Sequence, residues 1–185
     1  IDRCPEDMTR VDNFCIDKWE APNRDGELPL VMYSYRESKM WCEARGKRLC
    51  YDDEWTQACS GEGHWRWSYA KKHEYGICND DKTWRKYNGK LLRKWGPNAS
   101  SPEIESMAEL LLSVVKENSN KMKTIVHVMQ LYQADPSGDN RGCRSEYEVY
   151  DMVGNVEEWT TKRWNRRKNF NGSLKGRFWA EPRTC

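Results

Sequence analysis

The sequence YDMVGNVEEWT, residues 150–160, joins carboxylates on both sides of a Gly-Asn turn and closes with a tryptophan and a threonine. Its spacing allows the side-chain oxygens of Asp151 and Glu158 and the backbone carbonyls of Gly154 and Val156 to converge on one point. Calcium takes six to eight oxygens in a flexible shell, and a tight turn between acids supplies them. A polar turn with solvated acids has the same pattern, so spacing alone leaves both interpretations open.

The length and charge of the chain restrict its class. A chain of 185 residues fits one domain with an insertion, or at most two small domains. The net charge is only +2, which gives no general field for nucleic acid or membranes. No apolar run reaches transmembrane length and no signal-peptide pattern is present, and the start at Ile1 without Met suggests a processed or trimmed chain.

Cysteine usage is the stronger indication of compartment. The chain has 8 Cys and only 3 His, and the cysteines are scattered rather than grouped as CxxC pairs, which disfavours a zinc ribbon. We therefore expect a disulfide-bonded protein that is secreted, periplasmic or at the cell surface, with free buried thiols as the alternative. Cys4 and Cys15 bracket a short loop and make a plausible local pair.

The first half of the chain predicts short strands followed by two helices. Residues 1–35 alternate apolar and polar positions and predict strands and loops. Residues 36–46 predict a helix that turns Met40, Trp41 and Ala44 inward and has Gly46 as its C-cap. Residues 52–59 predict a second helix with an acidic N-cap, and this helix places Trp55, Ala58 and Cys59 on one inward face.

Residues 60–95 predict loops in which aromatic and basic side chains interleave. Such a run can stack on bases or sugars, but it also fits ordinary surface packing. Asn79, Asp80 and Asp81 follow Cys78 and form a second oxygen-rich cluster, which is a further candidate cation site.

Residues 102–133 show helical spacing and predict an inserted helical hairpin that begins near Pro102. The expected inward positions of its two helices are Ile104, Met107, Leu110, Leu111, Val114 and Val115, and then Met122, Ile125, Val126, Met129 and Tyr132. We expect this stripe to pack on the domain or on a partner, and His127 to be satisfied or exposed rather than a ligand.

The motifs FCIDKWEAPN, WCEARGKRLCYDDEWTQAC, GICNDD, VYDMVGNVEEWT and LKGRFW resemble, in this order, the formylglycine-generating enzyme (sulfatase-modifying factor) family. The sequences KRLC, CNDDKTW and LYQADPSG are similar to those of its cysteine-rich bacterial members. The resemblance covers most of the chain outside residues 85–134, which would be a helical insertion in a single domain, 1–185. It implies an α+β fold of the C-type-lectin-like type, loop-rich and disulfide-bonded.

The resemblance also implies two structural calcium sites. The first would use the side chains of Asp151 and Glu158 and the carbonyls of Gly154 and Val156. The second would use Asn79, the carbonyl of Asp80 and Asp135, the last chosen although the insertion obscures its match.

The catalytic strand departs from the family pattern. Family enzymes hold copper(I) with two cysteines that lie just after a GGS-aromatic strand. The matching strand here is LKGRFW, and the first cysteine position falls at Ala180 or Glu181, neither of which supplies a thiolate. We therefore assign no catalytic residue and do not expect copper.

The resemblance also bears on the disulfides. It pairs Cys59 with Cys185, and Cys78 with Cys143 is our third pair because these two flank the insertion. Family members continue to a GFRC strand that bonds the position of Cys42, so the chain is expected to be C-terminally incomplete. Cys50 has no assigned partner.

Three functional hypotheses follow. The residues favour a calcium-stabilised, non-catalytic binding or assembly module outside the cytoplasm, with a protein or glycan ligand and the insertion as a surface for self-assembly. An active copper- or metal-dependent oxidoreductase is the alternative. A second alternative is a carbohydrate-binding module; the aromatic residues for it would be Trp65, Trp67, Tyr69 and Trp84. We expect no nucleic-acid partner and no membrane span.

Overall fold

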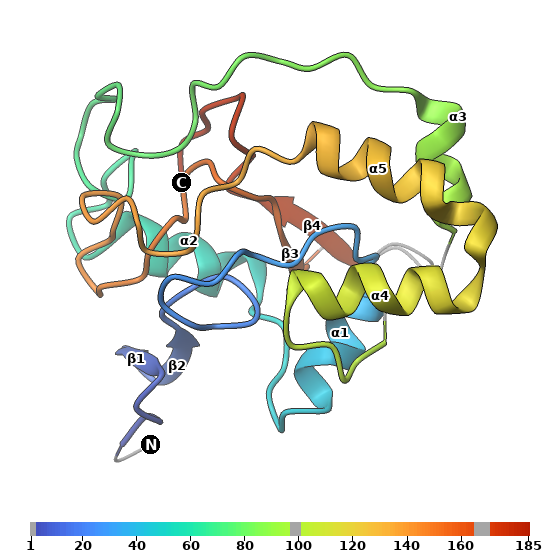
Figure 1. Ribbon diagram of the computed structural model, residues 1–185. Coiled ribbons are helices and arrows are strands. Elements are labelled where there is room, and N and C mark those ends of the chain that lie inside the picture. The colour runs from blue at the N-terminus through green and yellow to red at the C-terminus, as the bar shows by residue number, and fades with distance from the viewer. Residues whose placement is uncertain (1–2, 97–100, 165–170) are drawn as a thin grey trace.

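The computed structural model describes residues 3–96, 101–164 and 171–185 of the chain (Figure 1). Its elements, in order, are β1 (Met8–Val11), β2 (Phe14–Asp17), α1 (Tyr35–Glu43), α2 (Asp52–Ser60), α3 (Gly89–Leu92), the 3-10 helix η1 (Arg93–Trp95), α4 (Met107–Glu117), the 3-10 helix η2 (Ser119–Lys121), α5 (Met122–Leu131), β3 (Glu158–Thr161) and β4 (Gly172–Lys175). Strands β1 and β2 form one antiparallel sheet, and β3 and β4 form another. The α+β, loop-rich class expected from the sequence is confirmed.

The N-terminal hairpin follows the alternation in its sequence. Val11, Phe14 and Ile16 turn inward and are buried, while the residues between them face outward or lie at half-buried positions. Side chains alternate across a strand, so this pattern buries one face of the hairpin. The disulfide between Cys4 and Cys15 ties the segment before β1 to β2.

Helix α1 differs from its expected form. Ser34 caps it: the Ser34 hydroxyl accepts the Glu37 N–H, and the Glu37 carboxylate accepts the Ser34 N–H. This capping box fixes where the helix begins, and Glu37 and Trp41, one turn apart, are its buried residues. The prediction that Met40 and Ala44 point inward was wrong, since Met40 is 41% exposed and Ala44 is also exposed.

The predicted caps of the two N-terminal helices were also wrong. Helix α1 ends at Glu43 with Ala44 as its C-cap, and Gly46 takes its positive φ of 66° in the turn beyond. Helix α2 has the expected bounds within one residue, but Tyr51 rather than an acid is its N-cap.

Helix α2 contributes three residues to the larger apolar cluster. Trp55, Ala58 and Cys59 are buried on one helical face, as predicted. The disulfide from Cys59 to Cys185 fastens the C-terminal residue to this helix, and Cys78–Cys143 closes the third bridge. These three bridges join the cysteines that the sequence analysis had paired.

The inserted hairpin is present, although its first helix starts later and its second is rotated. Ser106 caps α4, so the helix begins at Met107 rather than near Pro102. The inward positions of α5 are Thr124, Ile125, His127 and Val128. The prediction that Met122, Val126 and Met129 lie inward was therefore wrong; these three side chains are exposed.

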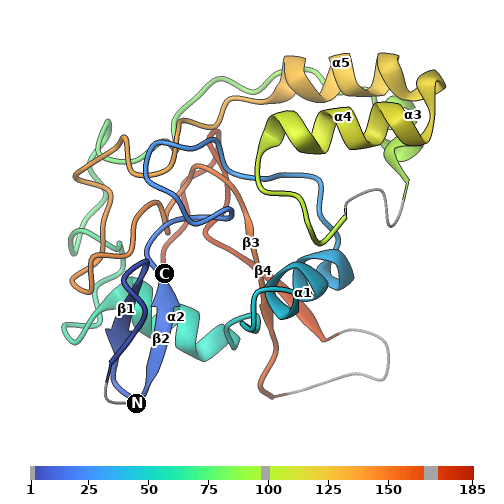
Figure 2. The same ribbon diagram turned by 60° about the horizontal axis from the view of Figure 1, so that its bottom comes forward.

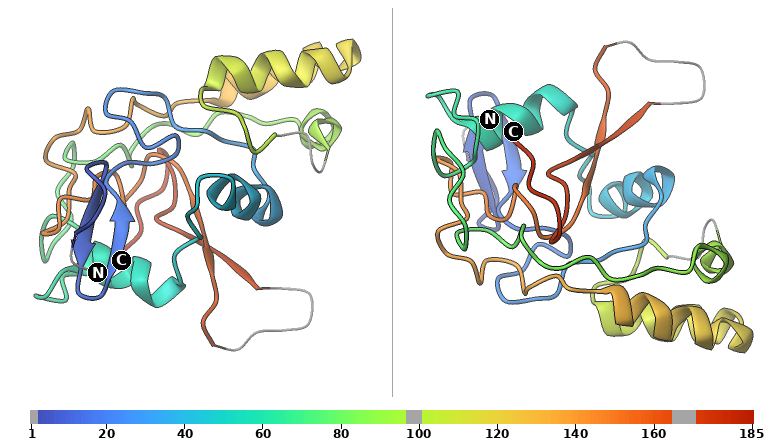
Figure 3. Two further views of the ribbon diagram at one scale, coloured as in Figure 1. Left: turned by 90° about the horizontal axis from the view of Figure 1, so that it is seen from below. Right: turned by 90° about the horizontal axis from the view of Figure 1, so that it is seen from above.

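The two helices of the hairpin run side by side and form a layer at the far end of the molecule from β1 and β2 (Figures 2 and 3). The segment before them contains α3 and η1, where only loop was expected. Trp95, Leu110, Val114, Ile125 and Val128 belong to a second apolar cluster beneath this layer. Within the described ranges, no helix is long and apolar enough to cross a bilayer.

Candidate calcium centre and central cavity

The 151–158 turn is built on unusual backbone conformations. Asp151, Gly154 and Asn155 all have positive φ, at 57°, 78° and 51°. A Cβ atom at Gly154 would lie 2.3 Å from the carbonyl oxygen of Asn79, so only glycine fits this contact. The turn is therefore in close backbone contact with the segment that carries the second predicted site.

Asn155 connects the two predicted sites. Its side chain is fully buried, and its Oδ1 accepts hydrogen bonds from Asn79 Nδ2 at 2.9 Å and the Asp135 N–H at 2.9 Å. Its Nδ2 donates to the Asp135 carbonyl at 3.1 Å and to Glu20 Oε2 at 2.7 Å. The structure thus brings together Asn79 and Asp135, which are far apart in sequence, through a residue that the sequence analysis did not single out.

Glu20 was also missed. Its carboxylate is buried, and it accepts hydrogen bonds from the Val156 N–H at 3.2 Å and the Ser137 hydroxyl at 2.8 Å, as well as from Asn155. Burial, with the nearby carboxylates of Asp151 and Glu158, raises the pKa of Glu20 well above its usual range. Its place in the motif FCIDKWEAPN was the only available signal, because its partners lie more than a hundred residues away.

The two acids of the first predicted site share this environment. Asp151 Oδ2 accepts the Gly138 N–H at 2.7 Å, and Glu158 Oε2 accepts the Trp55 indole N–H at 3.0 Å. Burial raises the pKa of Asp151 to about 7 and the pKa of Glu158 to about 7, despite these hydrogen bonds. The carboxyl groups of Glu20, Asp151 and Glu158 lie close enough to repel one another when charged, which favours their neutral forms. A cation bound among them would favour the charged forms instead.

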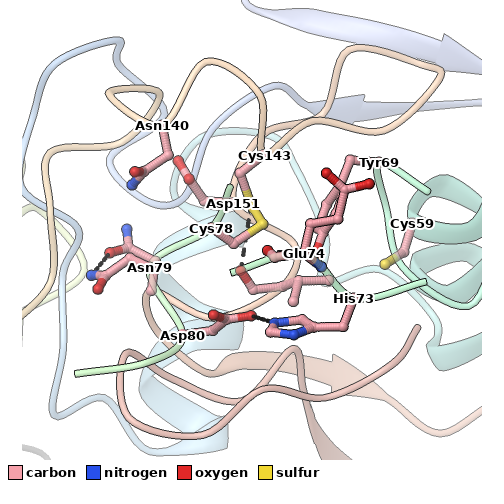
Figure 4. The surroundings of a disulfide bond; sticks show 12 residues. Cys59, Tyr69, His73, Glu74, Cys78, Asn79, Asp80, Asn140, Cys143 and Asp151 are labelled. Carbon is pink, nitrogen blue, oxygen red and sulfur yellow. Dashed lines mark hydrogen bonds and ion pairs between the residues drawn. A yellow bond between two sulfur atoms is a disulfide. The ribbon is translucent and has the colours of Figure 1, made fainter. Parts of the chain in front are cut away.

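Two residues of the second predicted site, Asn79 and Asp80, directly follow Cys78 of the Cys78–Cys143 disulfide (Figure 4). Asn79 Nδ2 donates to the Gln133 carbonyl at 3.0 Å, and Asp80 Oδ2 pairs with His73 Nε2 at 2.8 Å. The Asp135 carboxylate instead turns to the rim of the site, where Lys82 lies 3.3 Å and Asn140 Nδ2 3.1 Å from its oxygens.

Several buried oxygens in this region have no hydrogen-bond partner. Among the described residues, the carboxylate or amide oxygens in this condition are Asn79 Oδ1, Asp80 Oδ1 and Asp151 Oδ1. An unsatisfied buried acceptor costs about 1–3 kcal/mol, so such atoms require an explanation. All three belong to residues expected at calcium sites, although the resemblance assigned the carbonyl of Asp80 rather than its carboxylate. Hard oxygens of this kind fit calcium.

The side chains alone do not form a complete metal cage. In the described part of the chain, no group of three or more His, Cys, Asp or Glu side chains is arranged to hold a metal ion. Calcium would therefore need amide and backbone carbonyl oxygens as well, as the predicted sets with Asn79, Gly154 and Val156 include.

A cavity of about 870 Å³ lies beside the first site. Its lining includes Glu20, Cys42, Cys50, Trp55 and Glu158. Cys42 and Cys50 form no disulfide. Burial raises the pKa of Cys42 to about 11 and raises the pKa of Cys50 further, so both thiols are protonated at neutral pH.

The segment where the family places its first catalytic cysteine borders the same cavity. Phe178 and Trp179 contribute to the lining, and Ala180 and Glu181 follow them without a thiol. Cys185 is bonded to Cys59 and holds no free sulfur.

The aromatic residues considered for carbohydrate binding have different surroundings. Trp67 packs against His73 with ring centroids 4.7 Å apart, and the Tyr69 hydroxyl accepts the Glu74 N–H. Trp65 is half-buried, whereas Trp84 is 60% exposed. These side chains therefore do not form one open aromatic face.

Comparison with known proteins agrees with these features. Residues 7–185 match the family model described as the sulfatase-modifying factor enzyme 1-like domain. The chain is also similar to inactive C-alpha-formylglycine-generating enzyme 2 of Bos taurus, with 24% identity over 170 residues. That alignment covers 88% of this chain and 44% of the relative, so the chain spans less than half the length of that relative. The match along nearly the whole chain shows that the protein belongs to the sulfatase-modifying factor (FGE-sulfatase) family.

Proposed function

We propose that this chain is a calcium-stabilised, non-catalytic binding module on the formylglycine-generating-enzyme scaffold. The observation that carries the proposal is the sequence after Trp179, where Ala180 and Glu181 stand in place of a catalytic thiol. The residues that hold the fold together are present, from the disulfides to the Asn155 network. The similar bovine protein is described as inactive, which agrees with this proposal.

The cavity is the proposed ligand site. Its walls combine large aromatic surfaces with a few carboxylates, which is the usual composition of a site that buries a ligand. The three disulfides support a location outside the cytoplasm, where oxidising conditions maintain such bonds.

An active oxidoreductase remains the competing function, because Cys42 and Cys50 line the same cavity as free thiols. A copper(I) titration combined with an oxygen-consumption assay on a cysteine-bearing peptide separates the two. We expect weak copper binding and no turnover, since both thiols are protonated at neutral pH. Tight binding with turnover that disappears in Cys42→Ser or Cys50→Ser would contradict the binding-module proposal.

The calcium proposal rests on the partnerless oxygens of Asn79, Asp80 and Asp151. Its test is Glu158→Ala, compared with Glu157→Ala, which removes a neighbouring acid that pairs with Arg177 at 3.8 Å. At calcium concentrations of 100 times Kd, binding stabilises a protein by about 2.7 kcal/mol. Glu158→Ala should therefore lower the melting temperature more in calcium than in chelator, where it loses only the hydrogen bond from the Trp55 indole.

The control should behave differently. Glu157→Ala should have the same small effect in both buffers. Equal losses for Glu158→Ala in calcium and in chelator would make Glu158 a structural residue rather than a ligand. Metal analysis of the purified protein provides an independent check by its calcium and copper content.

An assembly role has one specific observation in its favour. Met122, Val126 and Met129 form an exposed stripe one turn apart along α5. We propose that this stripe is where copies of the chain associate. Val126→Lys should shift the protein toward monomer in sedimentation experiments, while a monomeric parent protein would contradict the proposal.

A further inference from the structure

The segment at residues 82–95, which we call the basic strap, has an unusual charge distribution. Its sequence KTWRKYNGKLLRKW contains no acid. The cations in it are Lys82, Arg85, Lys86, Lys90, Arg93 and Lys94. The whole chain carries a net charge of only +2, so the positive charge of this segment is local.

The structure holds the first half of the strap extended against α5 without pairing it as a strand (Figure 1, in green above α5). The strap is held at both ends of this half: the Lys82 N–H donates to the Trp179 carbonyl at 2.7 Å, and the Asn88 N–H donates to His127 Nε2 at 2.8 Å. Between them, Gln133 Nε2 donates to the Thr83 carbonyl at 3.0 Å, and Arg85 Nη1 donates to the Gln130 carbonyl at 2.8 Å. These bonds fix the strap before any partner binds, which lowers the entropy cost of binding. The buried His127 thus has a defined role as an anchor.

Two aromatic side chains project from this fixed segment. Trp84 is 60% exposed, and its ring stands perpendicular to that of Phe178, with centroids 4.9 Å apart. Tyr87 is 63% exposed. The Trp84 ring, which packs against Phe178, and the exposed Tyr87 ring are both available to stack on a planar or sugar surface.

Most of the cations are available for a partner. Lys82 pairs with Asp135, and Arg85 is bound to a backbone carbonyl. Within the described residues, the remaining four, Lys86, Lys90, Arg93 and Lys94, are exposed and form no ion pair. A run of unpaired cations beside open aromatic rings is complementary to a polymer that carries repeated anionic groups.

We propose that the basic strap binds an acidic polysaccharide, with Trp84 and Tyr87 stacking on sugar rings and the free cations contacting sulfate or carboxylate groups. Nucleic acid has similar general chemistry. The three disulfides favour the polysaccharide, since they indicate an oxidising compartment outside the cytoplasm.

The test measures binding of the full chain to a dextran sulfate oligosaccharide at low and at physiological salt. Lys86→Gln/Lys90→Gln/Lys94→Gln should weaken binding at least about tenfold at low salt and reduce its salt dependence. The matched control triple, with the same loss of charge at exposed residues outside the strap, is Arg36→Gln/Lys71→Gln/Lys72→Gln. It should retain nearly full affinity.

Trp84→Ala tests the aromatic contribution and should weaken binding about fivefold. Tyr75→Ala, which removes another highly exposed ring, is its control and should have little effect. Equal losses in the two triples would make the strap an ordinary solvated surface and overturn the proposal. Tighter binding of a single-stranded DNA oligonucleotide of equal charge would also overturn it, in favour of a nucleic-acid partner.

Discussion

Replacing the buried Asn155 with alanine should lower the free energy of unfolding by about 3–5 kcal/mol. Its buried side chain makes four hydrogen bonds, at 2.7, 2.9, 2.9 and 3.1 Å. A typical bond contributes about 1 kcal/mol net, and a bond to a charged group such as Glu20 contributes about 1.5–3 kcal/mol. Some partners keep another bond, as Glu20 does with Ser137, which limits the total.

Asn155→Asp provides a sharper test because it keeps the size and shape of the side chain. It replaces the amide donor with an oxygen that faces Glu20 Oε2 and the Asp135 carbonyl. Repulsion between these oxygens should make it at least as destabilising as the alanine variant. Asn140→Ala is the control; it removes one bond from a half-buried side chain and should cost about 1 kcal/mol or less.

The assay is urea unfolding with intact disulfides in chelator, so that hydrogen bonding is measured without metal. If the free energy of unfolding falls with urea concentration at the same slope for all variants, differences in the urea midpoint report differences in stability. If Asn155→Asp lost less than about 1 kcal/mol, or no more than Asn140→Ala, the network would not hold the two sites together as we infer.

Three other predictions concern different parts of the fold. Gly154→Ala should destabilise the fold by several kcal/mol, because the new Cβ would meet the Asn79 carbonyl oxygen and the positive φ adds about 1 kcal/mol of strain. Thermal melting measures this loss, and a value below about 1 kcal/mol would contradict the close contact. Burial opposes ionisation of Glu54, but hydrogen bonds from Arg48 outweigh this effect and lower the pKa of Glu54. The charged Glu54 therefore stabilises the fold above the unfolded pKa of about 4.3, and this stabilisation is lost as the pH falls through the lower folded pKa. The stability difference between wild type and Glu54→Gln should accordingly shrink between pH 6 and roughly pH 3 in urea titrations. Cys59→Ser opens a loop with a sequence separation of 126 and should cost about 4–5 kcal/mol in the chain-entropy model, measured by urea unfolding; an unchanged midpoint would contradict the bridge.

The sequence predicted those elements whose periodicity and burial agree. Helix α2 was predicted within one residue because its apolar positions lie on one face and pack on the core. On α5 the apolar residues encircle more of the helix, and packing buried Thr124 and His127 while it left Val126 exposed. Hydrophobicity alone could not identify the inward face, because polar partners in distant segments decided it.

The same reason limited the prediction of the candidate site. Asp151 and Gly154 could be selected from their local pattern. Glu20 and Asn155 could not, since their importance depends on contacts between residues separated by up to 136 positions. A single sequence does not reveal which distant side chains pair in the fold.

The way that His127 holds the basic strap has a consequence for amide exchange. Within the described structure, the N–H groups of residues 83–87 have no acceptor, whereas the Asn88 N–H is bound to the buried His127 ring. One slowly exchanging amide should therefore stand at the end of a rapidly exchanging run. Its exchange rate would follow the separation of the strap from α5, because the bond breaks whenever Asn88 leaves the His127 ring, so this single proton reports when the two come apart.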